Sequence, residues 1–206
     1  MSAIETYLAK PWLAHYQKGV PATVEVPLKS VAQAFDEATE RAPERAAVVF
    51  YGRSISYREL REATDRLACA LADLGVKKGD RVALYLLNSP QFIIAYFAAL
   101  KCGATVTPIS PVYTSHEVRY QLEDSGARAI VCQDILYEKV AKAGAALDLV
   151  VVTNVNEYLP TLKRLFSKKT EIPGKVHWLQ DLLKKYPAKP PAVTIDPKTD
   201  LAAGTR

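Results

Sequence analysis

The sequence predicts an α/β fold: a doubly wound, mostly parallel sheet with flanking helices, preceded by a β-hairpin. Between residues 81 and 153, four short apolar runs alternate with helical segments. Strands that read as continuous Val, Ile, Leu and Ala must be covered on both faces, as in a parallel sheet with right-handed crossovers. Upstream, a Gly-Arg turn joins two short β-rich runs, which indicates the hairpin. A chain of 206 residues, 49% hydrophobic and 24% charged, can bury a core of this size.

The first helix and the hairpin follow from capping and turn residues. Ser30 opens a helix with Gln33 at the capping-box position, and Pro43 ends the run. The apolar face expected for this helix consists of Val31, Ala34, Phe35 and Ala38. Residues 46–51 and 54–57 are then the two strands of the hairpin.

A longer helix begins at Ser56, which stands in capping-box spacing with Glu59, and it ends at Gly75. Apolar positions recur along it at steps of three and four. They are Leu60, Thr64, Leu67, Leu71 and Leu74. A stripe of this width must face a core.

The parallel sheet follows after residue 80. Its expected strands are residues 81–87, 104–108, 127–132 and 147–153. The helices between them are expected at 90–102, 114–124 and 136–145. Ser89 and Pro90 start the first of these helices, and Thr114 with Glu117 forms a capping box for the second.

The chain divides into three predicted parts. Residues 1–27 are rich in aromatics and prolines without a sustained period, which predicts an extended amino-terminal arm. Residues 28–153 form the α/β subdomain. Residues 154–206 are predicted to be a basic irregular segment and a Pro-rich linker, with one short helix at 178–186.

Composition restricts the function classes. A net charge of +5 favours anionic partners, but no zinc-ligand spacing, helix-turn-helix signature or aromatic-basic strip indicates nucleic acid. The three cysteines lie in apolar patterns and are expected to be buried thiols in a reducing compartment. The histidines are isolated, so no metal site is expected. Neither a leader pattern nor a run of about 18 apolar residues appears, and we expect a cytoplasmic protein.

Three segments, read together, resemble the acyl-CoA synthetase family of adenylate-forming enzymes. They are residues 75–90 (Gly-Val-Lys-Lys-Gly-Asp-Arg-Val-Ala-Leu, then Asn-Ser-Pro), residues 97–108 (Phe-Ala-Ala-Leu-Lys-Cys-Gly-Ala, running to a proline) and residues 110–127 (Ser-Pro-Val-Tyr-Thr-Ser-His-Glu, then Gln-Leu-Glu-Asp-Ser-Gly-Ala). The Pro-Val-Tyr-Thr form of the third segment is similar to the long-chain fatty acid members. The resemblance covers about residues 28–153 and identifies a scaffold.

The resemblance implies a truncated amino-terminal subdomain of a long-chain fatty acid–CoA ligase, which uses ATP, Mg²⁺ and CoA. In the family a Ser/Thr/Gly-rich phosphate loop follows an Asp-Leu-Ala sequence. Here Asp200, Leu201 and Ala202 are followed by four residues, and the sequence leaves open whether residues 203–206 are native. No catalytic residue is expected in this piece, which should be inactive in ligation and bind none of these cofactors tightly. The alternative is a non-catalytic nucleotide- or partner-binding α/β module.

Two sets of basic residues are candidate sites. By family analogy Lys139 and Lys142 approach the 3′-phosphate of CoA; otherwise they form a solvated helix face. A second set alternates with apolar residues over 159–169 in the pattern of an interfacial helix on anionic lipid, or of an amphipathic helix packed on the protein's own core. It consists of Lys163, Arg164, Lys168 and Lys169. The predicted partners are fatty acid, ATP and CoA in the parent, an anionic membrane surface for peripheral binding, and a second copy in a homodimer.

Overall fold

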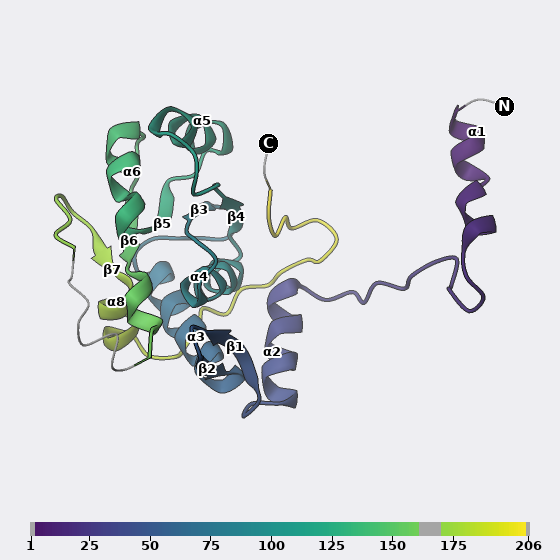
Figure 1. Ribbon diagram of the computed structural model, residues 1–206, viewed down its shortest axis with the longest axis horizontal. Helices are drawn as coiled ribbons and strands as arrows, with labels where there is room; N and C mark the ends of the chain where they lie inside the picture. The colour runs from purple at the N-terminus through teal and green to yellow at the C-terminus, as the bar shows by residue number, and fades with distance from the viewer. Residues whose placement is uncertain (1–2, 161–169, 205–206) are drawn as a thin grey trace.

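The computed structural model describes residues 3–160 and 170–204, and its centre is a five-stranded sheet covered by helices on both sides (Figure 1). The strand order is β4-β3-β5-β6-β7, and β1 and β2 form a separate two-stranded sheet. Every neighbouring pair in the large sheet is parallel, whereas β1 and β2 pair antiparallel. The predicted α/β fold with its preceding hairpin is confirmed.

The elements lie close to their predicted positions. The strands are β1 (Ala46–Phe50), β2 (Arg53–Ser56), β3 (Arg81–Tyr85), β4 (Thr105–Pro108), β5 (Ala129–Gln133), β6 (Leu149–Thr153) and β7 (His177–Trp178). The α-helices are α1 (Ala3–Leu8), α2 (Val31–Arg41), α3 (Tyr57–Asp73), α4 (Pro90–Lys101), α5 (Ser115–Ser125), α6 (Tyr137–Ala143) and α8 (Leu179–Lys185). Short 3-10 helices are η1 (Pro11–His15), η2 (Asp134–Leu136) and η3 (Val155–Tyr158). None of the helices in the described ranges is long and apolar enough to cross a bilayer.

Side-chain alternation along the strands divides the interior into two cores. Val82 and Leu84 of β3 belong to the core that also takes in residues of α2, α3, α4 and α8. Their neighbours Ala83 and Tyr85 belong to the other core, together with residues of α5 and α6. Because successive side chains of a strand point to opposite faces, one buried strand serves both cores.

Local hydrogen bonds fix the element ends. Both Ser56 and Thr114 close full capping boxes with the glutamates three residues later, as predicted. Ser30 accepts a hydrogen bond from the Gln33 N–H, but the Gln33 side chain donates to Glu37 Oε1 (3.2 Å), so that predicted capping box stays half formed.

The turn of the hairpin lies one residue earlier than predicted. Tyr51 and Gly52 occupy it with φ of 47° and 83°. Two successive positive φ angles are typical of the type I′ turn, whose twist matches the flanking strands.

The buried face of α2 differs from the predicted one. Ala32, Phe35 and Thr39 are buried, whereas Val31 is 45% exposed. Phe35 lies on both the predicted and the observed face, and its ring stacks on Phe97 of α4 with a centroid distance of 4.1 Å. The predicted Ala34 is exposed, like Val31.

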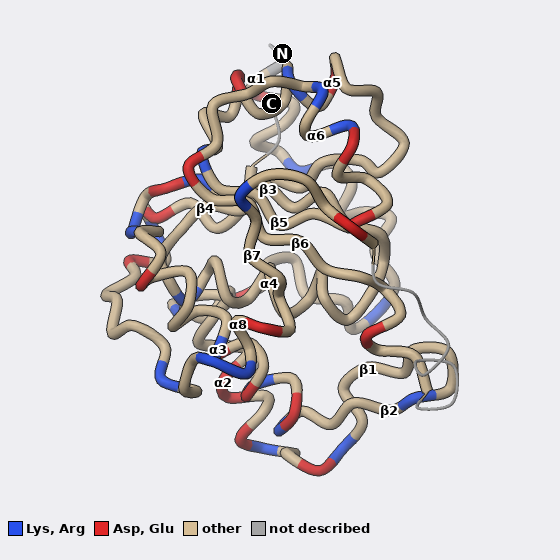
Figure 2. The backbone as a smooth tube through the Cα atoms, turned by 90° about the vertical axis from the view of Figure 1, so that its left-hand side faces the viewer, with Lys and Arg blue, Asp and Glu red and all other residues tan. Residues whose placement is uncertain are grey.

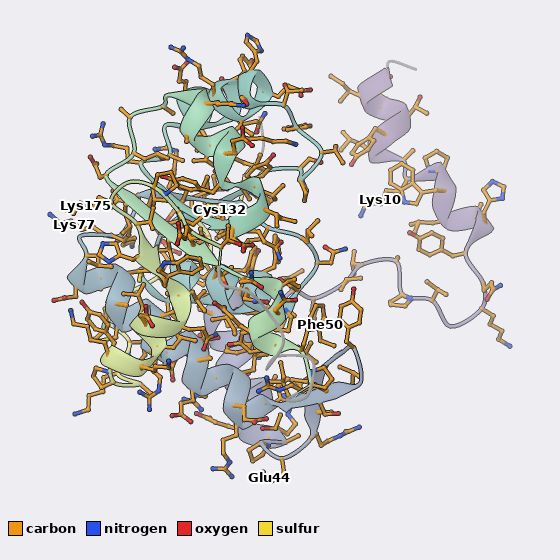
Figure 3. All side chains as sticks on the ribbon, turned by 60° about the vertical axis from the view of Figure 1, so that its left-hand side comes forward. Lys10, Glu44, Phe50, Lys77, Cys132 and Lys175 are labelled. Carbon is orange, nitrogen blue, oxygen red and sulfur yellow. The ribbon has the colours of Figure 1, made fainter. Side chains whose placement is uncertain are left out.

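The two flanking segments contain more regular structure than the sequence indicated. The arm predicted as extended holds α1 and η1, which Figures 1 and 3 show apart from the main body. Beyond residue 153, β7 extends the sheet next to β6, and Leu179 and Leu182 of α8 are buried in the first core. The predicted division into three domains stays a prediction, although its third part thus contributes to the fold.

A buried lysine joins the helices of the first core. Lys101 Nζ lies 2.5 Å from both Asp36 Oδ1 on α2 and Asp65 Oδ1 on α3, and its side chain is 5% exposed. Arg61 is the nearest further cation, at 3.5 Å from Asp36 and 3.7 Å from Asp65. Figure 2 shows basic and acidic residues interspersed over these helices. A buried ion group of this kind fixes three helices relative to one another.

We expect Lys101→Met to lower the free energy of unfolding by about 3 kcal/mol, because the Asp65 carboxylate, which is only 11% exposed, loses its closest cation. Arg119→Gln breaks an ion pair with Glu123 in which both side chains are more than half exposed, and should cost less than about 1 kcal/mol. Urea denaturation of both variants measures the difference. Equal losses would show that the Lys101 group does not hold the helices together.

Two glycines give a matched test of the packing of the carboxyl-terminal segment. Gly103 and Gly126 have φ of +70° and +67°, so alanine at either position costs about 1–2 kcal/mol of backbone strain. A Cβ on Gly103 would also lie 2.9 Å from Val193 Cγ1, whereas one on Gly126 would meet nothing within 4 Å. We expect Gly103→Ala to destabilise the protein more than Gly126→Ala in urea denaturation. Equal effects would contradict packing of Val193 against this turn.

Candidate functional site

The carboxyl ends of the parallel strands meet at one edge of the sheet, and the residues that follow them form the candidate site. From β3 the chain passes to β4 on one side, whereas β5, β6 and β7 succeed one another on the other side. The direction of winding therefore reverses between β3 and β5. Open α/β sheets bind ligands outside the strand ends at such a reversal.

A groove of about 610 Å³ lies at this edge. It is lined by residues that follow β3 and β4 and by residues of α4 and α5: Leu86, Leu87, Asn88, Phe92, 108–111, Tyr113 and Gln121. This mixture of apolar and amide or hydroxyl groups suits a ligand that has both apolar and polar parts. A smaller cavity of about 90 Å³ lies between α2 and the segment 195–202, near the amino end of β4.

The loop between β4 and α5 is held firmly at the groove. The Tyr113 carbonyl accepts hydrogen bonds from the Tyr85 hydroxyl (2.9 Å) and from Lys139 Nζ (2.8 Å). Both donors also reach the Pro111 carbonyl at 3.4 Å. Burial raises the pKa of Tyr85, so its hydroxyl stays protonated and able to donate. Thus the groove wall is preformed.

The predicted CoA residues are engaged in contacts within the chain. Lys139 supports the loop just described, and Lys142 Nζ lies 2.5 Å from Glu138 Oε1 on the exposed side of α6. Their role toward CoA stays a prediction. The four basic residues predicted to meet a membrane (163, 164, 168 and 169) lie outside the described residues.

A buried polar network lies beyond β5 and β6. The Asp134 carboxylate accepts from Asn154 Nδ2 (2.5 Å), Thr170 Oγ1 (2.6 Å) and the Ile135 N–H (2.9 Å). Three donors hold this carboxylate, and no cation of the described residues pairs with it. They tie the end of β5 to the segments that follow β6.

Glu157 lies just beyond β6 at this edge, in η3. Burial raises its pKa, and the donated hydrogen bond from Thr153 Oγ1 (2.7 Å) opposes that rise. Gln91, on the first turn of α4, donates to the Asn154 carbonyl at 2.8 Å. Neither Glu157 nor the Asp134 network was predicted from the sequence, because no motif connects residues so far apart in the chain.

Several buried polar atoms at this edge have no partner within the described residues. They are Ser89 Oγ, Gln91 Oε1 and Gln133 Nε2; a fourth such atom, Thr64 Oγ1, lies on α3. Ser89 precedes α4 as predicted, but its side chain makes no capping hydrogen bond. Unpartnered buried groups cost about 1–3 kcal/mol each, so this edge retains unused hydrogen-bonding capacity.

Two of the three cysteines are poorly suited to act as nucleophiles. Cys102 and Cys132 are buried, as predicted, and Figure 3 places Cys132 within the main body. Burial raises the pKa of both thiols to about 12. Cys69 is only half-buried. A thiol with such a high pKa is uncharged at neutral pH and a weak nucleophile.

The end of the Asp-Leu-Ala segment pairs with the outer side of β4 and runs toward the carboxyl ends of the strands. The Ala202 carbonyl accepts from the Val106 N–H (2.9 Å), and the Gly204 N–H donates to the Val106 carbonyl (3.0 Å). This bridge is parallel, so residues 202–204 run alongside β4 toward its carboxyl end. This stretch was predicted to be part of a linker, because so few residues are too short to show a strand pattern.

Comparison with known proteins agrees with this geometry. Residues 35–203 match the family model described as AMP-binding enzyme. The chain is 35% identical over 170 residues to a long-chain-fatty-acid–CoA ligase of Bacillus subtilis, covering 82% of this chain and 30% of the relative. It is 36% identical over 121 residues to tyrocidine synthase 2 of Brevibacillus parabrevis, covering 59% of this chain and 3% of the relative.

A solved structure shares the fold. A long-chain-fatty-acid-CoA ligase from Archaeoglobus fulgidus superposes with a TM-score of 0.72 at 25% identity, covering 91% of this chain and 36% of that chain. The chain thus spans about a third of the length of the fatty-acid ligases it matches. Since the family model covers residues 35–203, more than half of the sequence, the chain belongs to the AMP-binding enzyme family.

Proposed function

We propose that this chain is the amino-terminal part of a longer fatty acid–CoA ligase. The observation that carries the proposal is the pairing of residues 202–204 with β4, which directs the chain toward the groove at the carboxyl edge. A segment that followed Gly204 in a longer protein would enter this edge, where backbone N–H groups could bind phosphate. The fatty acid branch is favoured because its match covers 82% of the chain, against 59% for tyrocidine synthase 2.

The proposed reaction has two steps. A carboxylate oxygen of the fatty acid attacks the α-phosphorus of ATP, and pyrophosphate leaves with the electrons of the broken P–O bond. The CoA thiol, after losing its proton, then attacks the acyl carbon and AMP leaves. Both steps develop negative charge on oxygen and need N–H donors or cations at that point. In this chain, the firmly held loop at 110–114 would form one wall of the site.

Magnesium is proposed as a cofactor of the longer protein only. Among the described residues, no three His, Cys, Asp or Glu side chains gather closely enough to hold a metal ion. These residues therefore do not fit a metal site of their own. ATP and CoA are likewise proposed as substrates of the longer protein.

The 206-residue chain should show no ATP–pyrophosphate exchange with palmitate, because it lacks a phosphate-binding loop. The product of the gene read beyond Arg206 should carry a Thr-Gly-Gly-Thr-Thr-Gly-like loop and form palmitoyl-CoA. Replacing loop glycines by alanine in that product should lower kcat on the order of 10²–10³-fold. Exchange by the short chain, or a longer product without ligase activity, would contradict the proposal.

We also propose that the basic segment at 159–169 brings the protein to anionic membranes. Four glutamines at positions 163, 164, 168 and 169 should weaken binding to phosphatidylglycerol vesicles on the order of a thousandfold, since each basic residue near the surface contributes about 1 kcal/mol. Neutral vesicles should bind neither protein in a pelleting assay. The matched control replaces four exposed lysines elsewhere: Lys18, Lys77, Lys184 and Lys198. Equal, negligible binding of the unaltered protein to both vesicle types would end the membrane proposal.

A further inference from the structure

Lys78 contacts the carboxyl-terminal segment at two points. Its Nζ lies 2.7 Å from Asp200 Oδ2 and donates to the Thr194 carbonyl at 2.8 Å. Lys78 belongs to the turn between α3 and β3, so these contacts join residues more than a hundred positions apart in the chain. The Lys78 side chain is 44% exposed and that of Asp200 26% exposed, which leaves the pair at the surface but partly covered.

The turn that carries Lys78 is fixed to the start of β4. The Gly79 N–H donates to the Gly103 carbonyl (2.9 Å), and the Thr105 N–H donates to the Asp80 carbonyl (2.8 Å). A Cβ on Gly103 would lie 3.0 Å from Lys78 Cγ, so the lysine stem runs directly over the turn into β4. The ammonium group thus has a defined position relative to that strand.

Asp200 receives two donors at the position where the segment meets the sheet. Besides Lys78, the Asp196 N–H donates to Asp200 Oδ2 at 2.6 Å. The hydrogen bond from Lys78 is the main cause of the lowered pKa of Asp200, and the backbone N–H adds to it. The carboxylate is therefore charged and held at neutral pH.

The pairing with β4 begins at the next residue. Thr105 Oγ1 donates to the Leu201 carbonyl (3.0 Å), and the hydrogen bonds of Val106 with Ala202 and Gly204 follow. A shift of one residue along β4 would turn every following side chain to the other face. Because Asp200 directly precedes the first paired residue, its anchoring sets this register.

We propose that Lys78 is a positioning residue, which through Asp200 sets the register of residues 201–204 on β4 and so aims the chain beyond them at the groove. The effect on the register of residues 201–204 concerns this chain alone and is the structural half of the proposal. The effect on the chain beyond them is the catalytic half, and it rests on the proposed function, in which the phosphate loop follows this segment.

Hydrogen–deuterium exchange of the 206-residue chain, followed by NMR, tests the structural half. In Lys78→Met and Asp200→Asn, the amide of Gly204 and that of Val106 should exchange about two- to fivefold faster, as expected for loss of a partly exposed ion pair. Lys78→Arg should restore slow exchange. Lys77→Met is the matched control, because Lys77 is an exposed neighbour at the outer surface of the molecule (Figure 3).

The Ile109 amide, which donates to the Leu84 carbonyl, reports on general loosening and should exchange unchanged in all variants. The positioning role is wrong if the Gly204 and Val106 amides exchange as slowly in Lys78→Met as in Lys77→Met. It is also wrong if exchange of the Ile109 amide becomes faster by the same factor.

The same variants in the longer gene product test the catalytic half. Lys78→Met should lower kcat/KM for ATP about fivefold, because loss of the ion pair would misdirect the loop. Lys78→Arg should restore the activity, and Lys77→Met should leave it unchanged. Equal activity of Lys78→Met and Lys77→Met, despite faster exchange, would overturn the catalytic half. A longer product inactive even without substitutions would contradict the proposed function and leave the exchange result valid for the fold.

Discussion

The hydrogen-bonding groups on the outer edge of β4 fix where the carboxyl-terminal segment lies. An open parallel sheet leaves unpaired N–H and C=O groups on its edge strands. On β4, Val106 finds both partners in the segment 202–204, and at the other side β7 covers β6. The carboxyl-terminal stretch is thus part of the sheet, and its direction follows from the parallel pairing. That direction also connects the scaffold to the groove beyond the strand ends.

Polar groups are distributed unevenly between the two ends of the sheet. At the carboxyl edge, Asp134 is fully supplied with donors, while Ser89, Gln91 and Gln133 each keep an atom without a partner among the described residues. In ordinary proteins nearly all buried polar atoms have a hydrogen-bond partner. Bound water is able to supply the missing partners at this edge.

Several lysines of this basic protein stabilise the fold through contacts within the chain. Lys101 balances two carboxylates between three helices, Lys139 donates to backbone carbonyls of the groove loop, and Lys78 holds Asp200. Each of these ammonium groups replaces water by protein acceptors and fixes two or more segments. These three lysines therefore serve the fold, because their ammonium groups are engaged with protein acceptors.

Local signals in the sequence were enough to predict most of the elements. Capping boxes at Ser56 and Thr114, glycine stops and continuous apolar runs act over a few residues, so the strands, the helices and the doubly wound class could be predicted from them. Features that depend on contacts between distant residues could not be predicted in this way. The buried face of α2 depends on its packing against α3 and α4, and the pairing of residues 202–204 depends on a free edge at β4. Nothing local in the sequence indicates that Tyr85 and Lys139 donate to the same carbonyl. These residues come together only when the chain is folded.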